Sequence, residues 1–161
     1  MKKILTMLSL SALFLVGCGQ KALTNNIYPD ENAKVGEQYG AMTVSAVPTE
    51  ENPIYMSFTG EVSISGEYSY SGEGASFGEN QFCFSIIDTE EMKKLPKSEY
   101  FKDTTGKNFC LTNTDKAKEL LDEYGSATIT INAFQDNIKT ESEVPSMATL
   151  VSVESKTEAQ K

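Results

Sequence analysis

Apolar and polar residues alternate in several separate stretches of this chain, and that period of two constrains the fold more than any other feature. The clearest stretch is 81–87, where Phe82, Phe84 and Ile86 fall on one face. Alternation of this kind is typical of half-buried β-strands. We therefore expect strands there and in the other stretches of strand-like texture, which are 41–47, 54–65, 107–112, 126–134 and 146–153.

The stretch 54–65 is long for a strand and contains a glycine. Its apolar residues keep one parity on both sides of Gly60, and Tyr68 and Tyr70 continue the same alternation. A glycine inside such a run is typical of a strongly bent strand. The Gly-rich segment 71–80 follows, and we predict a hairpin loop there.

In one later segment, residues 117–124, the apolar residues recur at helical spacing instead of alternating. Asn113 or Thr114 can cap a helix there, and Gly125 stands where a C-terminal glycine is expected. A shorter helical turn is predicted after Asp88, which can act as its N-cap. The residues that recur at helical spacing in the longer helix are Ala117, Leu120, Leu121 and Tyr124.

Taken in order, the predicted elements between residues 54 and 153 are three strands, one helix and two more strands. This order resembles the OB-fold, a five-stranded Greek-key barrel with its helix in that position. The resemblance implies a mainly β fold, a small OB-like barrel with one α-helix after its third strand. An open β-sandwich with one helix is the alternative. Some exported OB-like lipoproteins, related to the tRNA-anticodon-binding-like group, place a cysteine in the strand before this helix, and Phe109-Cys110-Leu111 is similar.

The N-terminus joins a short positive segment to an apolar run. Two lysines precede residues 4–16, and that run is too short for the ~20 residues that a membrane-spanning helix needs. It ends in Leu15-Val16-Gly17-Cys18, which resembles the lipobox of bacterial lipoprotein precursors. In that family the cysteine receives a diacylglyceryl group, becomes the first mature residue and is usually acylated. An ordinary cleavable signal or an N-terminal membrane anchor is the alternative.

The resemblance to the lipobox predicts how the chain is divided into segments and where the protein is located. The resemblance implies export and a membrane anchor through the acylated Cys18. Gly19, the residue after the cysteine, favours the periplasmic face of the outer membrane if the cell is Gram-negative. The predicted segments are a signal peptide at 1–17, a lipidated flexible tether at 18–40, the OB-like domain at 41–155 and a disordered tail at 156–161.

Two further cysteines, Cys83 and Cys110, fall in predicted strands. An even pair in an exported chain is typical of a disulfide. If the two strands are neighbours, the bridge would contribute about 3 kcal/mol, mainly by restricting the unfolded chain. Two buried free thiols are the alternative.

The composition argues against several classes of function. The chain has no His and no Trp, and its 14 basic residues, all lysines, face 23 acidic residues for a net charge of −9. Without arginine and with this charge, nucleic-acid binding is not expected. Without histidine, the Ser-His-Asp and Cys-His arrangements and most zinc sites are missing. We expect no metal, no cofactor and no enzymatic activity.

Aromatic residues at the Gly-rich segment are the candidate partner-binding residues. Tyr68 and Tyr70 stand beside that segment, and Phe77 lies within it. In an OB-like barrel the ligand surface is formed by the face of strands 2 and 3 and by the loops between strands 1–2 and 4–5. Tyrosines there would offer a large contact area with a polar tip. Cross-strand packing of the two tyrosines is the alternative.

Three functional hypotheses follow from these observations. The leading one is a membrane-anchored, non-enzymatic envelope lipoprotein whose barrel binds a protein, or a peptide or glycan. The second is an inhibitor or exclusion factor, in which the acidic chain neutralises a cationic cell-wall-active enzyme or another external attacker. A hydrolase is the third, and the predicted position of the acidic pairs in solvated loops and turns argues against it.

Overall fold

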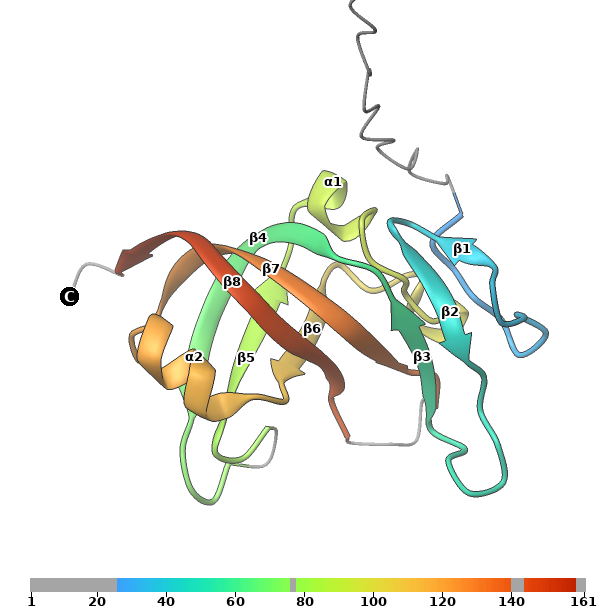
Figure 1. The fold of residues 1–161 in the computed structure, drawn as a ribbon, viewed down its shortest axis with the longest axis horizontal. Helices are drawn as coiled ribbons and strands as arrows, with labels where there is room; N and C mark the ends of the chain where they lie inside the picture. The colour runs from blue at the N-terminus through green and yellow to red at the C-terminus, as the bar shows by residue number, and fades with distance from the viewer. Residues whose placement is uncertain (1–25, 76–77, 140–143, 159–161) are drawn as a thin grey trace, which may run out of the picture.

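The computed structural model describes residues 26–75, 78–139 and 144–158, and its centre is a closed β-barrel (Figure 1). The barrel strands are β4 (Val62–Ser71), β5 (Gln81–Ile86), β6 (Lys107–Leu111), β7 (Tyr124–Asn137) and β8 (Ser146–Glu158). Neighbouring strands run antiparallel from β7 through β4 and β5 to β6, and β7 also pairs antiparallel with β8. The ring closes where β6 and β8 pair in parallel.

The parallel pairing of β6 with β8 confirms the predicted fold class. Residues 109–111 of β6 lie opposite residues 146–148 of β8. The helix α2 (Thr114–Leu120) lies between the third and fourth barrel strands, which is the order of an OB-like barrel. The fold is a closed five-stranded mixed barrel with additional strands and short helices, and the open sandwich is wrong.

Alternation along the strands places their apolar faces inside the barrel. Phe84, Phe109 and Phe134 are fully buried. The rings of Phe84 and Phe109 stack at 5.6 Å between centroids, and Phe134 meets Phe109 edge-on at 6.0 Å. Such aromatic contacts stabilise a core beyond the effect of area burial alone. Ala117 of α2 and Leu95 of the β5–β6 connection are also buried, so residues outside the strands complete the core.

A bent segment joins the barrel to the additional strands. β3 (Tyr55–Thr59) pairs with the end of β7, whereas β4 pairs with earlier residues of the same strand. Gly60 lies between β3 and β4 with a φ of +128°. Glycine adopts this conformation readily because it has no Cβ. The predicted bend at Gly60 is confirmed, although the strand is interrupted there.

The N-terminal segment 26–46 packs on the rest of the domain, which corrects the predicted extent of the flexible tether. β1 (Gln38–Tyr39) pairs with β2 (Met42–Ala46), and β2 pairs with β3. Ile27 and Tyr39 are buried, and the carbonyl of Ile27 accepts a hydrogen bond from Lys97 N–H at 2.7 Å. These isolated apolar side chains sit in a polar stretch without periodicity, so the pattern concealed their burial.

The two helices differ in how well their ends were predicted. Asp88 caps α1 (Thr89–Met92) as expected, and its carboxylate accepts hydrogen bonds from the N–H groups of Glu90 and Glu91. In contrast, α2 ends at Leu120, so the prediction that it continues to Tyr124 is wrong. Tyr124 begins β7 and its side chain is 41% exposed.

Gly125 is not a helix terminator but a point of close approach between strands. It pairs with Tyr68 of β4 on one side and with Glu158 of β8 on the other. A Cβ at this position would lie 2.5 Å from the carbonyl oxygen of Thr157. Pairing through residue 158 also shows that β8 runs beyond the predicted domain end at 155, into the segment predicted as tail.

The predicted disulfide is confirmed. Cys83 and Cys110 lie directly opposite each other on β5 and β6 and are bonded through their sulfur atoms. The glycine of the β4–β5 loop that covers this bridge is Gly78, where a Cβ would clash with both sulfur atoms. The bridge therefore joins the second and third barrel strands and lies against the loop above them.

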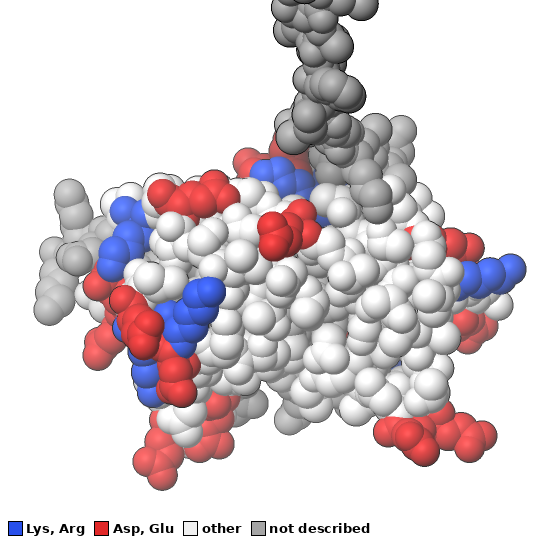
Figure 2. Space-filling model, viewed as in Figure 1, with Lys and Arg blue, Asp and Glu red and all other residues white. Residues whose placement is uncertain are grey.

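Figure 2 shows one face of the domain, in the same view as Figure 1, and most of that face carries uncharged residues. The acidic and basic side chains gather toward its edges, notably over α2. The outward positions of β7 include Ser126, Thr128 and Thr130. This face therefore offers few charges to a partner, although the chain as a whole is acidic.

Replacing Ile27 tests the packing of the N-terminal segment. We expect Ile27→Ala to lower the free energy of unfolding by about 2 to 4 kcal/mol, because it removes a buried side chain. Val35→Ala is the matched control, since Val35 is 63% exposed and its replacement should change stability by less than about 0.5 kcal/mol. Urea unfolding followed by circular dichroism measures both. If both variants lose equally little stability, the result would contradict the packing of this segment and support a flexible tether.

Removing the disulfide tests its contribution to the barrel. We expect the double replacement Cys83→Ser and Cys110→Ser to lower the free energy of unfolding by about 3 kcal/mol, since the bridge restricts the unfolded chain. Urea unfolding of the wild-type protein with and without dithiothreitol should reproduce that difference. An unfolding midpoint that does not respond to either treatment would contradict the bridge.

Candidate functional site

The outer face of β5 and β6 forms one side of the candidate site. Ser85 of β5 pairs with Asn108 of β6 on this face, two residues along each strand from the Cys83–Cys110 bridge. Their neighbours Phe84 and Phe109 point into the core, so the alternation that fills the barrel also turns Ser85 and Asn108 outward. These strands are the second and third of the barrel, and their outer face is where OB-like barrels carry ligands.

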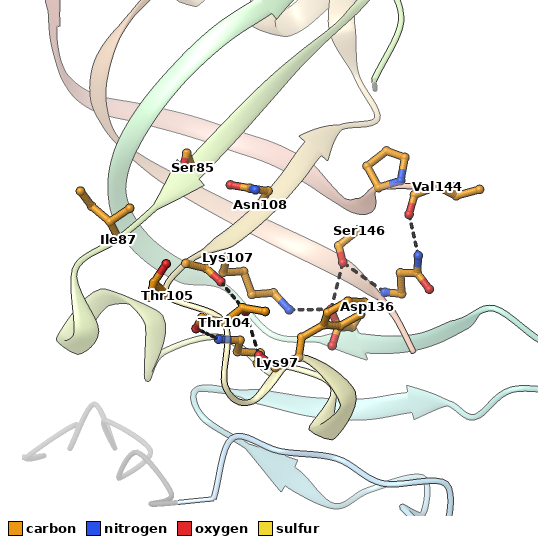
Figure 3. Close-up of a pocket in the computed structure, with 14 residues that line it drawn as sticks. Ser85, Ile87, Lys97, Thr104, Thr105, Lys107, Asn108, Asp136, Val144 and Ser146 are labelled. Atoms are coloured by element: carbon orange, nitrogen blue, oxygen red, sulfur yellow. Dashed lines mark hydrogen bonds and ion pairs between the residues drawn. The ribbon is translucent and has the colours of Figure 1, made fainter. Parts of the chain in front are cut away.

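An open depression of about 710 Å³ lies beside this face. A volume of that order accommodates a small ligand or a few residues of a peptide. Its walls come from β5 and β6, from the long β5–β6 connection and from the facing ends of β7 and β8 (Figure 3). Two regions of the sequence, 85–108 and 136–146, therefore meet at one surface.

A buried ion pair forms part of the lining of the depression. Lys107 Nζ lies 2.5 Å from Asp136 Oδ1, and both side chains are almost fully buried. Lys107 Nζ also lies 4.9 Å from the centroid of the Phe134 ring, within reach of a cation–π interaction. Burial lowers the pKa of Lys107, and the adjacent carboxylate of Asp136 opposes that shift.

Asp136 is held by hydrogen bonds from three different segments. Ser98 N–H donates to Oδ2 at 2.6 Å, and Ser146 Oγ donates to Oδ1 at 2.9 Å, in addition to the bond from Lys107. Ser146 Oγ in turn accepts from Asn137 N–H at 3.1 Å. A buried charge is stable only with such compensation. This network ties the β5–β6 connection to the ends of β7 and β8.

Lys97 supplies a second buried ammonium group. The residue is 4% exposed, and its Nζ donates to the carbonyl oxygen of Thr104 at 2.7 Å. Burial lowers the pKa of Lys97, and the positive charge of Lys107 lowers that pKa further, against the opposing effect of Asp136 and Asp103. Lys107 is paired to Asp136, whereas Lys97 makes no ion pair within the described residues and has Asp103 only as a more distant negative charge.

Exposed apolar side chains lie at the margin of the depression. Ile87 is 71% exposed and Val144 is 43% exposed. Figure 3 places them on opposite sides, with Lys107 and Asp136 between them. Phe101 and Pro145 also line the depression. The site thus joins buried charges to an apolar rim.

The structure separates the predicted aromatic residues from this depression. Tyr68 is 4% exposed and stacks on Phe84 at 5.4 Å between centroids, so the prediction that it contacts a partner is wrong. Tyr70 is partly buried, packs against Phe82 and has the Nζ of Lys118 5.1 Å from its ring centroid. Neither tyrosine lines the depression. Phe77 and Cys18 lie outside the described residues.

Sequence reasoning missed the lysines and the aspartate of this site. A signal for Lys107 was present, because it shares the parity of Phe109 in its strand and so belongs to the inward face. Asp136 likewise shares the parity of Phe134 in β7. Lys97 carries no such signal, since it lies in an irregular connection between β5 and β6.

The comparisons with known proteins assign no family to the chain. No protein-family model, no curated protein and no solved structure matches it. Within the described ranges, the structure contains no helix long and apolar enough to cross a membrane. In that same part of the chain, no three Cys, Asp or Glu side chains cluster in a way that could hold a metal ion.

Breaking the buried ion pair tests how the site is held together. We expect Asp136→Asn to lower the free energy of unfolding by about 3 to 5 kcal/mol, because Lys107 would stay buried without its counter-charge. Glu99→Gln is the control, since it breaks an exposed pair with Lys102 that is worth at most about 1 kcal/mol. Urea unfolding at neutral pH compares the two variants. Similar losses would show that the buried pair does not hold the site.

Proposed function

We propose that this chain is an exported, lipid-anchored binding module of the cell envelope, with no enzymatic activity of its own. The acylated Cys18 would hold it in the membrane, on the periplasmic face of the outer membrane if the cell is Gram-negative. Its barrel would bind a protein partner, or a peptide or glycan, through the depression beside β5 and β6. The observation that carries the proposal is the position of that depression on the ligand face of an OB-like barrel.

The chemistry of the depression favours binding over catalysis. Ser146 Oγ donates to Asp136, but that carboxylate is already paired with Lys107 and bonded to Ser98 N–H, which makes it a poor base for activating the hydroxyl. Lys107 is held by the same carboxylate. The side chains that remain available are Lys97, neutral hydrogen-bonding groups and apolar rim residues, which are groups that orient a ligand.

The distance between the lipid and the domain supports a partner at the membrane surface. Eight residues lead from Cys18 to Asn26, where the described structure begins. At about 3.5 Å per residue this span reaches at most about 28 Å. The next residue, Ile27, accepts a hydrogen bond from Lys97 N–H in the wall of the depression. The proposed site would therefore work close to the bilayer.

Crosslinking and capture from intact envelopes tests the proposal. We expect the lipidated wild-type protein to recover a partner in near-stoichiometric amount and Asn108→Arg to reduce recovery at least about tenfold, because a long charged side chain would obstruct the exposed floor of the depression. Ser69→Arg is the matched control, since Ser69 is an exposed position of β4 that does not line the depression.

A version with Cys18→Ala separates the anchor from the binding surface. It should lose the partner if the lipid is needed to bring the two proteins together. Recovery that is the same for wild-type protein, Asn108→Arg and Ser69→Arg would contradict the proposed surface. Recovery that does not depend on Cys18 would contradict the membrane-tethered mode of binding.

A further inference from the structure

We infer that the depression recognises the carboxylate of a peptide C-terminus that ends in an apolar residue. This inference rests on the proposed function and names the ligand chemistry of the same site. The carboxylate would bind to Lys97 Nζ, and the apolar side chain would lie against the rim that includes Ile87 and Val144. Three features of the site support this assignment: the unused donors of Lys97, the charge balance of the lining and the apolar rim.

Lys97 has hydrogen-bonding capacity that the described structure does not use. An ammonium group carries three donors. Within residues 26–75, 78–139 and 144–158, the acceptor for Lys97 Nζ is the carbonyl oxygen of Thr104 alone. The residue is nevertheless 96% buried, being 4% exposed. A buried ammonium with spare donors is costly unless an acceptor completes its shell, and a ligand carboxylate is such an acceptor.

The charge balance of the lining favours an anionic ligand. Two lysines and one aspartate line the depression, and the aspartate is engaged by Lys107, Ser146 and Ser98. Among the lining residues the balance is therefore positive, with Asp103 acting on Lys97 from outside the lining, although the chain has a net charge of −9. Because the negative net charge of the chain repels anions in general, a carboxylate would be retained only where this positive group lies.

The rest of the lining fits a short peptide better than a bare anion. Asn108, Thr105 and Ser85 offer side-chain donors and acceptors for peptide N–H and C=O groups. Ile87 and Val144 are large apolar side chains left exposed at the margin. An apolar terminal side chain would bury part of that surface, at about 25 cal/mol per Å². The site is thus suited to a carboxylate followed by amides and flanked by apolar atoms.

Isothermal titration calorimetry on the intact lipidated protein, purified in mild detergent, tests the inference. The probe is the peptide acetyl-Gly-Ala-Val with a free C-terminal carboxylate, compared with the same peptide as its C-terminal amide. We expect the free acid to bind at least about tenfold more tightly, because a charge-assisted hydrogen bond is lost in the amide. Equal affinity for both peptides, or no binding of either, overturns the inference.

Variants assign the binding to the named side chains. Lys97→Met should reduce the affinity for the free acid at least about tenfold, whereas Lys102→Met should leave it unchanged, since Lys102 is an exposed lysine outside the depression. In case Lys97→Met impairs folding, Ile87→Ser provides a second test at an exposed position and should weaken binding several-fold. An affinity that neither Lys97→Met nor Ile87→Ser changes overturns the assignment.

A small carboxylate distinguishes a peptide from another source of the same anion. Hexanoate should bind at least about tenfold more weakly than the free-acid peptide, because it lacks the amide groups. If hexanoate binds as tightly and with the same dependence on Lys97, the peptide part of the inference is wrong. If partner capture depends on Asn108 but the free-acid peptide does not bind, the carboxylate chemistry is wrong while the proposed function stands.

Discussion

The rest of the domain depends on a short parallel pairing between β6 and β8, because this pairing closes the barrel. It joins residues 109–111 to residues 146–148, and it begins only where β8 begins. The preceding residues of β6, Lys107 and Asn108, pair with β5, and the pairing with β8 starts only at Phe109. The depression lies at that point, and Lys107, Asn108 and Ser146 are among its lining residues. The site is therefore placed just beyond the end of the pairing that closes the barrel.

Side chains continue the contact where the backbone ladder ends. Lys107 of β6 bonds to Asp136 of β7, and Ser146 at the start of β8 bonds to the same carboxylate. At the other end of the closing pair, the side chain of Asn113 bonds to the backbone N–H and carbonyl of Leu150. Asn113 was predicted as a possible helix cap, yet it makes no side-chain cap bond because its amide is used on β8. Polar side chains therefore secure both ends of the parallel pairing.

Most of the barrel could be predicted from the sequence because its strands are half-buried and alternate. The elements that failed are those whose environment is not periodic. Ile27 and Tyr39 are single apolar residues in a polar stretch, so their burial depends on a surface that forms only after the barrel closes. Gly125 has the position of a helix stop, but tertiary packing required it between Tyr68 and the backbone of Thr157. Local propensity was overridden there by strand pairing.

The candidate site could be predicted only in part, because fold and site are carried by different residues. The order of the strands predicts which face of an OB-like barrel could carry a ligand. The prediction for Tyr68 assumed that a tyrosine beside a loop is exposed. The alternation of its strand places Tyr68 on the inward face instead, and the residue is buried. Lys107 and Asp136 occupy inward positions that aliphatic residues could fill, since replacing a buried ion pair with apolar residues of similar volume is often neutral or stabilising. A chain with leucines at both positions would be expected to form the same barrel. It would lose the Lys107–Asp136 pair but keep the ammonium group of Lys97 in the lining. Through its bonds to Ser98 and Ser146, the pair joins the walls of the depression, and the barrel itself does not require it.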